Sequence, residues 1–350
     1  MNTLLTDTKR FSTIEMDAFN SVFPSSSFEN YFSDLLDQLD TPVKNLAREF
    51  LLSGGKRIRP YLLHACADSH SRCSNDLLKA SAILEIVHAA TLIHDDVIDS
   101  ADTRRGIRTM HSVFGEHTAV LFGDSLFSFA LELSSEFPTT EVCRIVSVAT
   151  KKTCFGEINQ NFLKGDIDLT SINYFNIIQD KTGELFRASC YLGAYLTGVP
   201  VEDCNNLGNF GASLGINYQL YDDLLDIFGS QSKCNKTLGT DFKARKFTLP
   251  FIRLFELVSP DERSDLIELL DQEISNDFLE NRVSDLFQKY RIFDLCFSEL
   301  VKRISFSKNI ARDYSNPDIS ERLISFISSF EEKISMISQR KNPNFVAITS

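Results

Sequence analysis

Two short stretches of this sequence crowd aspartates onto otherwise apolar runs, LIHDDVIDSADTRRG and QLYDDLLDIFG. The aspartates are Asp95, Asp96 and Asp99 in the first stretch and Asp222, Asp223 and Asp226 in the second. On a helix, the first and last aspartate of each motif stand one turn apart on the same face. Like charges at that spacing destabilise a helix by roughly 0.2–0.5 kcal/mol. A cation is therefore expected beside each motif.

Mg²⁺ suits these motifs, because it prefers oxygen ligands and is usually held by one or two carboxylates together with substrate phosphates. Two helices that carried such motifs and faced each other would clamp a diphosphate. The alternative is a solvated acidic helix turn, which a single DDxxD would not exclude. The second copy of the motif, and the Arg104-Arg105-Gly106 sequence after the first copy, favour a metal site.

Basic residues that could balance the remaining phosphate charge occur in several stretches. GGKRIRP sets its basic residues between flexible glycines and a stiff proline, and DKTGELF carries a Lys-Thr pair. Taken singly, each of these basic residues is also typical of a helix C-terminus or of a solvated surface. Taken together they favour anion binding. They are Lys56, Arg57, Arg59, Arg104, Arg105, Lys181, Lys236, Lys243, Arg245 and Lys246.

The elements that must position these residues are predicted to be helices. Apolar residues recur at three-and-four spacing in DLLKASAILEIVHAATLIHDDVID, TAVLFGDSLFSFALELSSEF and NLGNFGASLGINYQLYDDLLDIFG, and no set of segments alternates with period two. Short links with glycine and proline separate the helical segments. We therefore predict an all-α chain with a single domain at 28–340, a flexible arm at 1–27 and a loose tail at 341–350.

The bulk properties are typical of a soluble globular protein in a reducing compartment. The chain has 350 residues, of which 43% are hydrophobic, with a net charge of −12 and eight scattered cysteines. It can bury a core without disulfides. Its acidity argues against nucleic acid as a partner. The sequence predicts no transmembrane segment and no signal or transit peptide, and hence a cytoplasmic location.

Six stretches resemble, in order and approximate spacing, the motifs of the trans-isoprenyl diphosphate synthases: GGKRIRP, LIHDDVIDSADTRRG, GEINQ, KTG, YQLYDDLLD and KTLGTDFKARKFTLP. The resemblance covers roughly residues 46 to 255. It implies the isoprenoid synthase fold, an all-α bundle of ten or more helices around a central catalytic cavity, in a homodimer or alternatively a heteromer. It also implies a prenyltransferase that condenses isopentenyl diphosphate with an allylic diphosphate (1′-4, trans) and releases pyrophosphate.

The same resemblance implies roles for individual residues. Three Mg²⁺ ions, or Mn²⁺ in their place, are held by the six aspartates and stabilise the departing pyrophosphate. The allylic diphosphate is bound by Arg104, Lys181, Lys236 and Lys246. The isopentenyl diphosphate is bound by Lys56, Arg59, His88 and Arg105. Lys181, Thr182 and Gln219 act in catalysis, the last two by polarising or steadying the reacting carbons.

The helix before Asp95 bears on product length. Short-chain members of the family often carry a bulky aromatic residue where this chain has Ala90 and Thr91. A growing product would pass these residues and next reach Val87. The absence of an aromatic residue at these two positions predicts a product of C20 or longer, as in the long-chain polyprenyl synthases. The stretch KTGELFRASCYLGA resembles the geranylgeranyl and short-chain branch equally well, so a farnesyl or geranylgeranyl diphosphate synthase is the alternative.

Three other classes of protein share part of this pattern. A class I terpene cyclase has one DDxxD and Mg²⁺, but it lacks the second DDxxD and the GGKRIRP stretch. A non-catalytic subunit of a heteromeric synthase tends to lose aspartates from these motifs, whereas all six are present here. A general divalent-cation module would be expected to show an EF-hand loop, which the sequence lacks. The pattern therefore favours a prenyltransferase.

Overall fold

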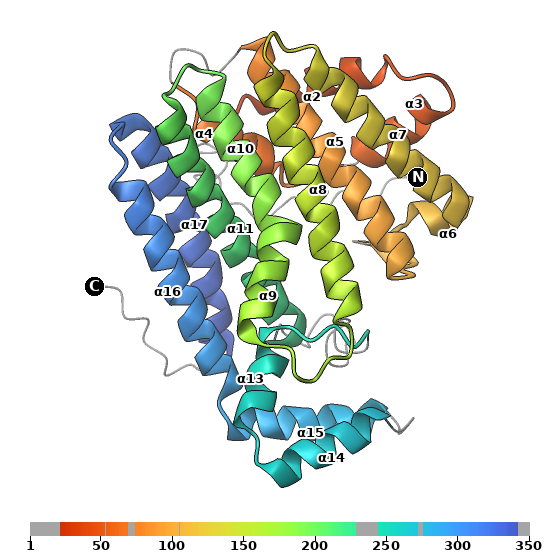
Figure 1. The fold of residues 1–350 in the computed structure, drawn as a ribbon, viewed down its shortest axis with the longest axis vertical. Helices are drawn as coiled ribbons and strands as arrows, with labels where there is room; N and C mark the ends of the chain where they lie inside the picture. Colours follow the sequence, from red (N-terminus) through yellow and green to blue (C-terminus); the bar gives the residue numbers. More distant parts are fainter. Residues whose placement is uncertain are drawn as a thin grey trace. The chain divides into compact units, whose positions relative to one another are not determined.

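The computed structural model describes residues 22–52, 54–68, 74–104, 106–228, 244–271 and 276–341. Within these ranges the regular secondary structure is helical apart from one short antiparallel hairpin, β1 (Thr103–Arg104) with β2 (Ile107–Arg108) (Figure 1). The helices are α2 (Ser25–Leu36), α3 (Val43–Leu51), α4 (Ile58–Ala65), α5 (Asn75–Ile98), α6 (Met110–Phe114), α7 (Glu116–Ser135), α8 (Thr140–Phe162), α9 (Ser171–Ile178), the π-helix η1 (Gln179–Gly183), α10 (Glu184–Tyr195), α11 (Val201–Phe228), α13 (Leu249–Leu257), α14 (Pro260–Asp271), α15 (Asn276–Lys289), α16 (Ile292–Arg312) and α17 (Pro317–Lys341). The predicted all-α class is confirmed.

The chain divides into two compact units whose segments alternate along the sequence. The first unit comprises Met1–Lys151, Glu184–Ala212 and Ala311–Ser329. The second unit comprises Lys152–Gly183, Ser213–Ile310 and Phe330–Ser350. The single domain expected for residues 28–340 stays a prediction.

The first described helix begins inside the arm predicted at residues 1–27. Helix α2 starts at Ser25, and the ring of Phe23 is fully buried 5.3 Å from the rings of both Phe28 and His64. The remainder of the arm, residues 1–21, lies outside the described residues, as do residues 342–350 of the predicted tail.

The core of the first unit is built around α5. This helix is buried over most of its length and packs against α7 and α4. Helix α4 in turn packs closely on α10, where a side chain at Gly193 would collide with the backbone carbonyl of Leu63. Helix α5 is long and apolar enough to cross a membrane, but 72% of its most apolar window is buried inside the protein. Such burial is typical of the core helix of a soluble protein.

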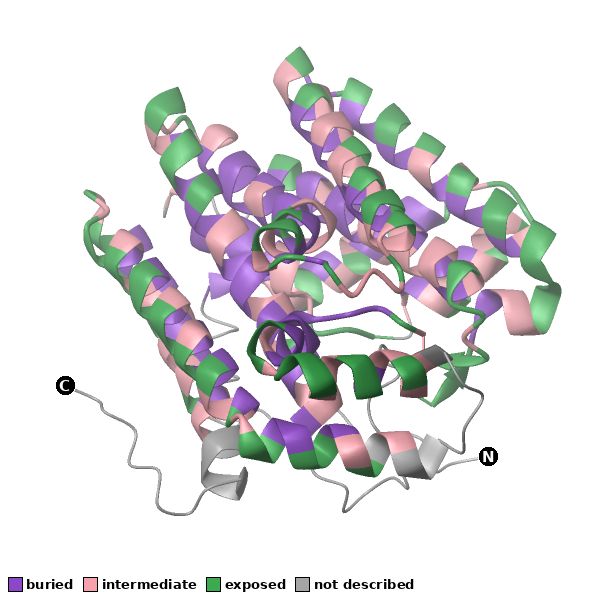
Figure 2. Ribbon diagram, turned by 60° about the horizontal axis from the view of Figure 1, so that its bottom comes forward, coloured by how far each residue is buried: buried purple, intermediate pink, exposed green. Residues whose placement is uncertain are grey.

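Phenylalanine rings fill much of the core of the second unit. The ring of Phe287 on α15 lies 5.1 Å from that of Phe251 on α13 and 5.4 Å from that of Phe228 on α11. Phe228 also lies 5.2 Å from Phe293 on α16. Figure 2 shows the resulting pattern, in which helices carry buried residues on one side and exposed residues on the other. This burial anchors the C-terminal end of α11, which carries the second acidic motif.

Candidate active site

The first acidic motif lies at the C-terminal end of α5, which ends at Ile98 with Asp99 as its C-cap. The backbone N–H of Asp99 donates to the carbonyl oxygen of Asp95 (2.8 Å), so helical hydrogen bonding continues through the motif. The last turn of this helix contains no basic residue. Because the C-terminal end of a helix carries a partial negative charge, carboxylates there are unfavourable unless a cation offsets them.

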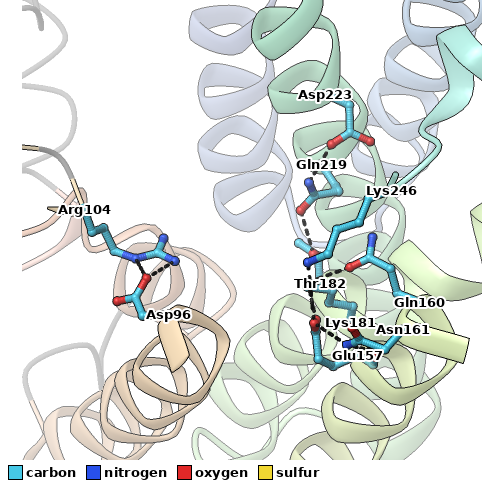
Figure 3. A network of polar contacts seen from close by, with 10 residues as sticks. All are labelled: Asp96, Arg104, Glu157, Gln160, Asn161, Lys181, Thr182, Gln219, Asp223 and Lys246. Carbon is cyan, nitrogen blue, oxygen red and sulfur yellow. Dashed lines mark hydrogen bonds and ion pairs between the residues drawn. The ribbon is translucent and has the colours of Figure 1, made fainter. Parts of the chain in front are cut away.

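Asp96 is held inside the first unit by Arg104. Nε of Arg104 donates to Oδ1 of Asp96 at 2.8 Å, and Asp96 is only 6% exposed (Figure 3). Burial raises the pKa of Asp96 above its ordinary value, although the charge and hydrogen bond of Arg104 act to lower it. The β1–β2 hairpin positions Arg104, and its turn contains Gly106 at φ +79°, a left-handed conformation that suits glycine. Arg105 lies outside the described residues.

The second acidic motif also lies at the C-terminal end of a helix, α11, whose last turn lacks basic residues. Asp222 is exposed, Asp226 is half-buried and Asp223 is 4% exposed. Asp223 accepts hydrogen bonds on both oxygens, from Nε2 of Gln219 (2.8 Å) and from the hydroxyl of Tyr174 (2.5 Å). The two motifs therefore share one arrangement, in which the middle aspartate is buried and bonded to a protein donor.

Two residues predicted to act in catalysis are in direct contact. The hydroxyl of Thr182 donates to Oε1 of Gln219 at 2.8 Å, while Nε2 of the same amide donates to Asp223 (Figure 3). Because the amide of Gln219 accepts a hydrogen bond on its oxygen and donates one from its nitrogen, its orientation is fixed. Thr182 belongs to the π-helix η1, and π-helical turns of this kind are frequent at functional sites. The structure thus joins the KTG stretch to the second acidic motif.

Two of the lysines predicted to bind diphosphate share one carboxylate, that of Glu157 on α8. Lys181 forms an ion pair with Oε2 of Glu157 and donates a hydrogen bond of 2.9 Å to Oε1 of Gln160. Nζ of Lys246, which is 5% exposed, lies 3.8 Å from Oε1 of Glu157. Two lysine side chains beside one carboxylate are suited to hold an anion at this place. Lys236 lies outside the described residues.

Close packing of α8 against η1 makes this arrangement possible. A side chain at Gly156 would collide with the backbone N of Lys181 and would lie 2.8 Å from its Cα. Glycine at this position therefore lets Glu157, the next residue, reach the lysine. The roles of Glu157 and Gln160 were missed by sequence reasoning, although both lie in the GEINQ stretch at i, i+3 spacing, and this spacing was the available signal.

The GGKRIRP stretch and His88 belong to the first unit. Lys56 is exposed, and the guanidinium of Arg59 lies 5.1 Å above the ring of Phe186 on α10. His88 is half-buried on α5, and its carbonyl oxygen accepts a hydrogen bond of 2.8 Å from the hydroxyl of Thr91. Helix α4, which begins directly after Arg57, packs on both α5 and α10. Lys56, Arg59 and His88 are thus carried by elements that pack together.

The residues predicted to control product length lie on the buried side of α5. Ala90 is 0% exposed and Val87 is 1% exposed, whereas Thr91 is half-buried. Their small or moderate side chains leave no aromatic ring at these positions. That they line a tunnel for the product stays a prediction, as does the expectation that the two acidic motifs face each other.

The donor set of the acidic motifs fits a hard divalent cation. In the part of the chain that the structure describes, no three acidic, histidine or cysteine side chains converge as a preformed metal centre. Mg²⁺ does not require one, because it retains several waters and binds through one or two carboxylates together with substrate phosphates. The less buried aspartates can supply such oxygens, and they are Asp95, Asp99, Asp222 and Asp226.

Comparison with known proteins identifies the family. Residues 40–286 match the model of the polyprenyl synthetase family. The chain is 34% identical over 235 residues to the short chain isoprenyl diphosphate synthase of Methanocaldococcus jannaschii, which is 66% of this chain and 72% of that protein. It is 32% identical over 249 residues to the octaprenyl diphosphate synthase of Escherichia coli, which is 70% of this chain and 77% of that protein. The chain therefore belongs to the polyprenyl synthetase family.

Solved structures agree with this assignment. The crystal structure of a polyprenyl synthase from Caulobacter crescentus, complexed with calcium and isoprenyl diphosphate, superposes with a TM-score of 0.76 at 29% sequence identity. The match covers 89% of this chain and 95% of that one. The expected isoprenoid synthase fold is thereby confirmed. All of the predicted site residues fall within the matched range 40–286, whereas α2 precedes it.

Proposed function

We propose that this protein is a Mg²⁺-dependent trans-prenyltransferase that condenses isopentenyl diphosphate with an allylic diphosphate. The observation that carries this proposal is the hydrogen-bonded chain of Thr182, Gln219 and Asp223. Thr182 comes from the KTG stretch, whereas Gln219 and Asp223 belong to the second acidic stretch, so these contacts join two of the motifs on which the resemblance rests. Family membership supports the same reaction class.

The reaction begins when the allylic C–O bond breaks and pyrophosphate leaves with the bonding electrons. The double bond of isopentenyl diphosphate then attacks the allylic carbon (1′-4), and a proton is lost from the new product. When bound, Mg²⁺ (three ions in our proposal, with Mn²⁺ as a substitute) supplies Lewis-acid stabilisation of the departing diphosphate. We propose all six motif aspartates for this site, with Asp96 and Asp223 also aligning the motifs through their protein donors.

The basic residues divide between the two substrates in this proposal. Lys181 and Lys246, which share Glu157, bind the allylic diphosphate together with Arg104 and Lys236. Lys56, Arg59, His88 and Arg105 bind isopentenyl diphosphate. Thr182 and Gln219 have fixed dipoles, which suit them to steady positive charge at the reacting carbons without any reorganisation.

We further propose a product of C20 or longer, with a short-chain product as the alternative. The relatives include both a short chain and an octaprenyl synthase, so family membership leaves the length open. The proposal is supported by Ala90 on α5, because a small buried residue leaves room where an aromatic ring would block a growing chain.

A homodimer in the cytoplasm is the proposed working form, with a heteromer as the alternative. Helix α8 exposes Phe155, Ile158 and Phe162, which are 52%, 47% and 83% exposed and share one helical face. An apolar stripe of this kind is typical of a surface that another subunit covers.

The test supplies purified protein with Mg²⁺, isopentenyl diphosphate and an allylic primer, and measures pyrophosphate release and the dephosphorylated products by chromatography. Asp95→Asn is expected to lower turnover by at least about a hundredfold, since it removes a proposed metal ligand. Asp76→Asn, which makes the same change in the first turn of the same helix, is the matched control and is expected to retain activity. Equal activity of the two variants would refute the metal role of Asp95.

A further inference from the structure

Arg57, the middle basic residue of GGKRIRP, is bonded inside the protein. Its Nε and Nη2 donate to the two oxygens of Glu29 at 2.8 and 3.1 Å. Its Nη1 donates to Glu85 at 2.8 Å, and Nη2 also donates to the carbonyl oxygen of Leu51 at 3.0 Å. Four of the five guanidinium N–H groups are therefore engaged by the protein.

The surroundings of Arg57 hold its side chain in one place. The guanidinium lies 5.6 Å from the ring centre of Phe28 and 5.4 Å from that of Phe32, and the side chain is 9% exposed. Burial alone would lower the pKa of Arg57, but hydrogen bonds and charge from Glu29 and Glu85 raise it above its ordinary value. A charged group with these contacts is an internal anchor and has little capacity left for a substrate.

The backbone at Arg57 forms the turn that carries the neighbouring basic residues. Arg57 has φ +45° and ψ 39°, a left-handed conformation, and it is the N-cap of α4. A non-glycine residue in this conformation costs energy that its surroundings must offset. The turn sets the direction in which exposed Lys56 and half-buried Arg59 point, since they flank it at one and two residues.

The partners of Arg57 tie this turn to two helices of the first unit. Glu29 belongs to α2, which precedes the range matched by the family model. Glu85 belongs to α5 and lies three residues before His88, one helical turn away. Arg57 therefore connects the turn that holds Lys56 and Arg59 to the helix that holds His88.

We propose that Arg57 is a positioning residue for the isopentenyl diphosphate site, which it serves by fixing Lys56 and Arg59 relative to His88 through Glu29 and Glu85. This inference rests on the proposed function, because it takes those three residues to be the substrate's ligands. Loss of Arg57 would weaken the binding of isopentenyl diphosphate in two ways. The turn would be released from its anchor, and the carboxylates of buried Glu85 and partly exposed Glu29 would lose their counter-ion.

The experiment compares Arg57→Gln with Arg57→Lys, and uses Arg48→Gln as the matched control. Arg48 makes an ion pair of 2.8 Å with Asp37 in the same N-terminal region, but at an exposed position. In Arg57→Gln we expect the KM for isopentenyl diphosphate to rise about tenfold or more, with the KM for the allylic substrate changed less than about twofold. Arg57→Lys keeps the charge but cannot reach both carboxylates as a fork, and it should fall between these values. Calorimetry, which measures binding without turnover, should rank the affinities of these proteins for isopentenyl diphosphate in the same order.

Equal changes in both KM values, or no change in either, would overturn the proposal, because a general structural role does not select one substrate. If Arg57→Gln does not fold, Glu29→Gln provides the same comparison, and an unchanged KM for isopentenyl diphosphate in that variant would also overturn it. Absence of turnover by the unmodified protein would refute the proposed function instead. The calorimetric comparison of isopentenyl diphosphate binding would then decide the role of Arg57 alone.

Discussion

The hydroxyl of Tyr174 donates a hydrogen bond of 2.5 Å to Oδ2 of Asp223, and both side chains are buried. Nε2 of Gln219 donates a hydrogen bond to the other oxygen of this aspartate, Oδ1. Asp223 is thus oriented from two helices, α9 and α11, before any ligand arrives. Hydrogen bonds to a buried charged acceptor are among the stronger ones in proteins, and groups that orient metal ligands in this way commonly affect metal binding.

Tyr174→Phe removes only the hydroxyl, and we expect it to lower turnover or Mg²⁺ affinity about ten- to a hundredfold, because Asp223 then loses the hydrogen bond that orients its Oδ2. The measurement is the initial rate as a function of Mg²⁺ concentration, together with the increase in Tm that Mg²⁺ and pyrophosphate produce. The second measurement reports binding without turnover.

Tyr195→Phe serves as the control for this change. The hydroxyl of Tyr195 is 3.1 Å from that of Thr139 in the first unit, so the same atom is lost from a tyrosine that is bonded to a threonine hydroxyl. A Tyr174→Phe protein that matched the Tyr195→Phe protein in both measurements would contradict the orienting role.

The sequence predicted those parts of the fold and site that depend on local pattern. Helical periodicity and the position of apolar residues follow from the spacing of side chains along one helix, so the all-α fold could be predicted. The family resemblance implies catalytic roles for Thr182 and Gln219, and the structure places these two side chains in hydrogen-bond contact.

The contacts that cross between elements could not be predicted in the same way. Tyr174 lies in an apolar helix where an aromatic residue is ordinary core, and nothing in its neighbourhood indicates that its hydroxyl reaches Asp223. Glu157 could be noticed only as part of GEINQ, because its partner lysines come from distant segments. Arg57 resembled a further phosphate ligand, and only its bonds to Glu29 and Glu85 reveal an internal role.

Ala90→Phe tests whether the product extends along α5. Because Ala90 is fully buried and no aromatic ring stands at this position, a phenylalanine is expected to block the growing chain and shorten the main product by at least about one isoprene unit, close to one helical turn. The measurement is chromatography of the dephosphorylated products of the two proteins.

Ala82→Phe on the same helix is the control, because Ala82 is also fully buried but lies about two turns further from Asp95. A product of unchanged length from a folded and active Ala90→Phe protein would place the growing chain elsewhere. If Ala90→Phe lowers the Tm but leaves the product unchanged, the larger side chain only overpacks the core, and Ala90 has a packing role alone.

Glu262 joins helices α14 and α15, which lie beside each other in the second unit (Figure 1). Its two oxygens accept hydrogen bonds from Nζ of Lys289 (2.7 Å) and from the hydroxyl of Tyr290 (2.5 Å). The hydrogen bond from Lys289, followed by that from Tyr290, lowers the pKa of Glu262 to about 2. The ionised carboxylate is therefore favoured by the folded state.

A group whose pKa is lowered by folding stabilises the protein above its unfolded pKa, near 4.3 for glutamate, and this stabilisation is lost as the pH falls toward the folded value of about 2. We expect Glu262→Gln to lower Tm at pH 7, and the difference from the unmodified protein to shrink steadily between about pH 5 and pH 2, because the unmodified protein takes up a proton there on unfolding. Thermal unfolding followed by circular dichroism across this range provides the measurement. Asp261→Asn, at the adjacent exposed position of α14, removes the same charge and controls for the change in net charge. A Tm difference for Glu262→Gln that stayed constant from pH 7 to pH 3 would mean that Lys289 and Tyr290 do not hold this carboxylate in solution.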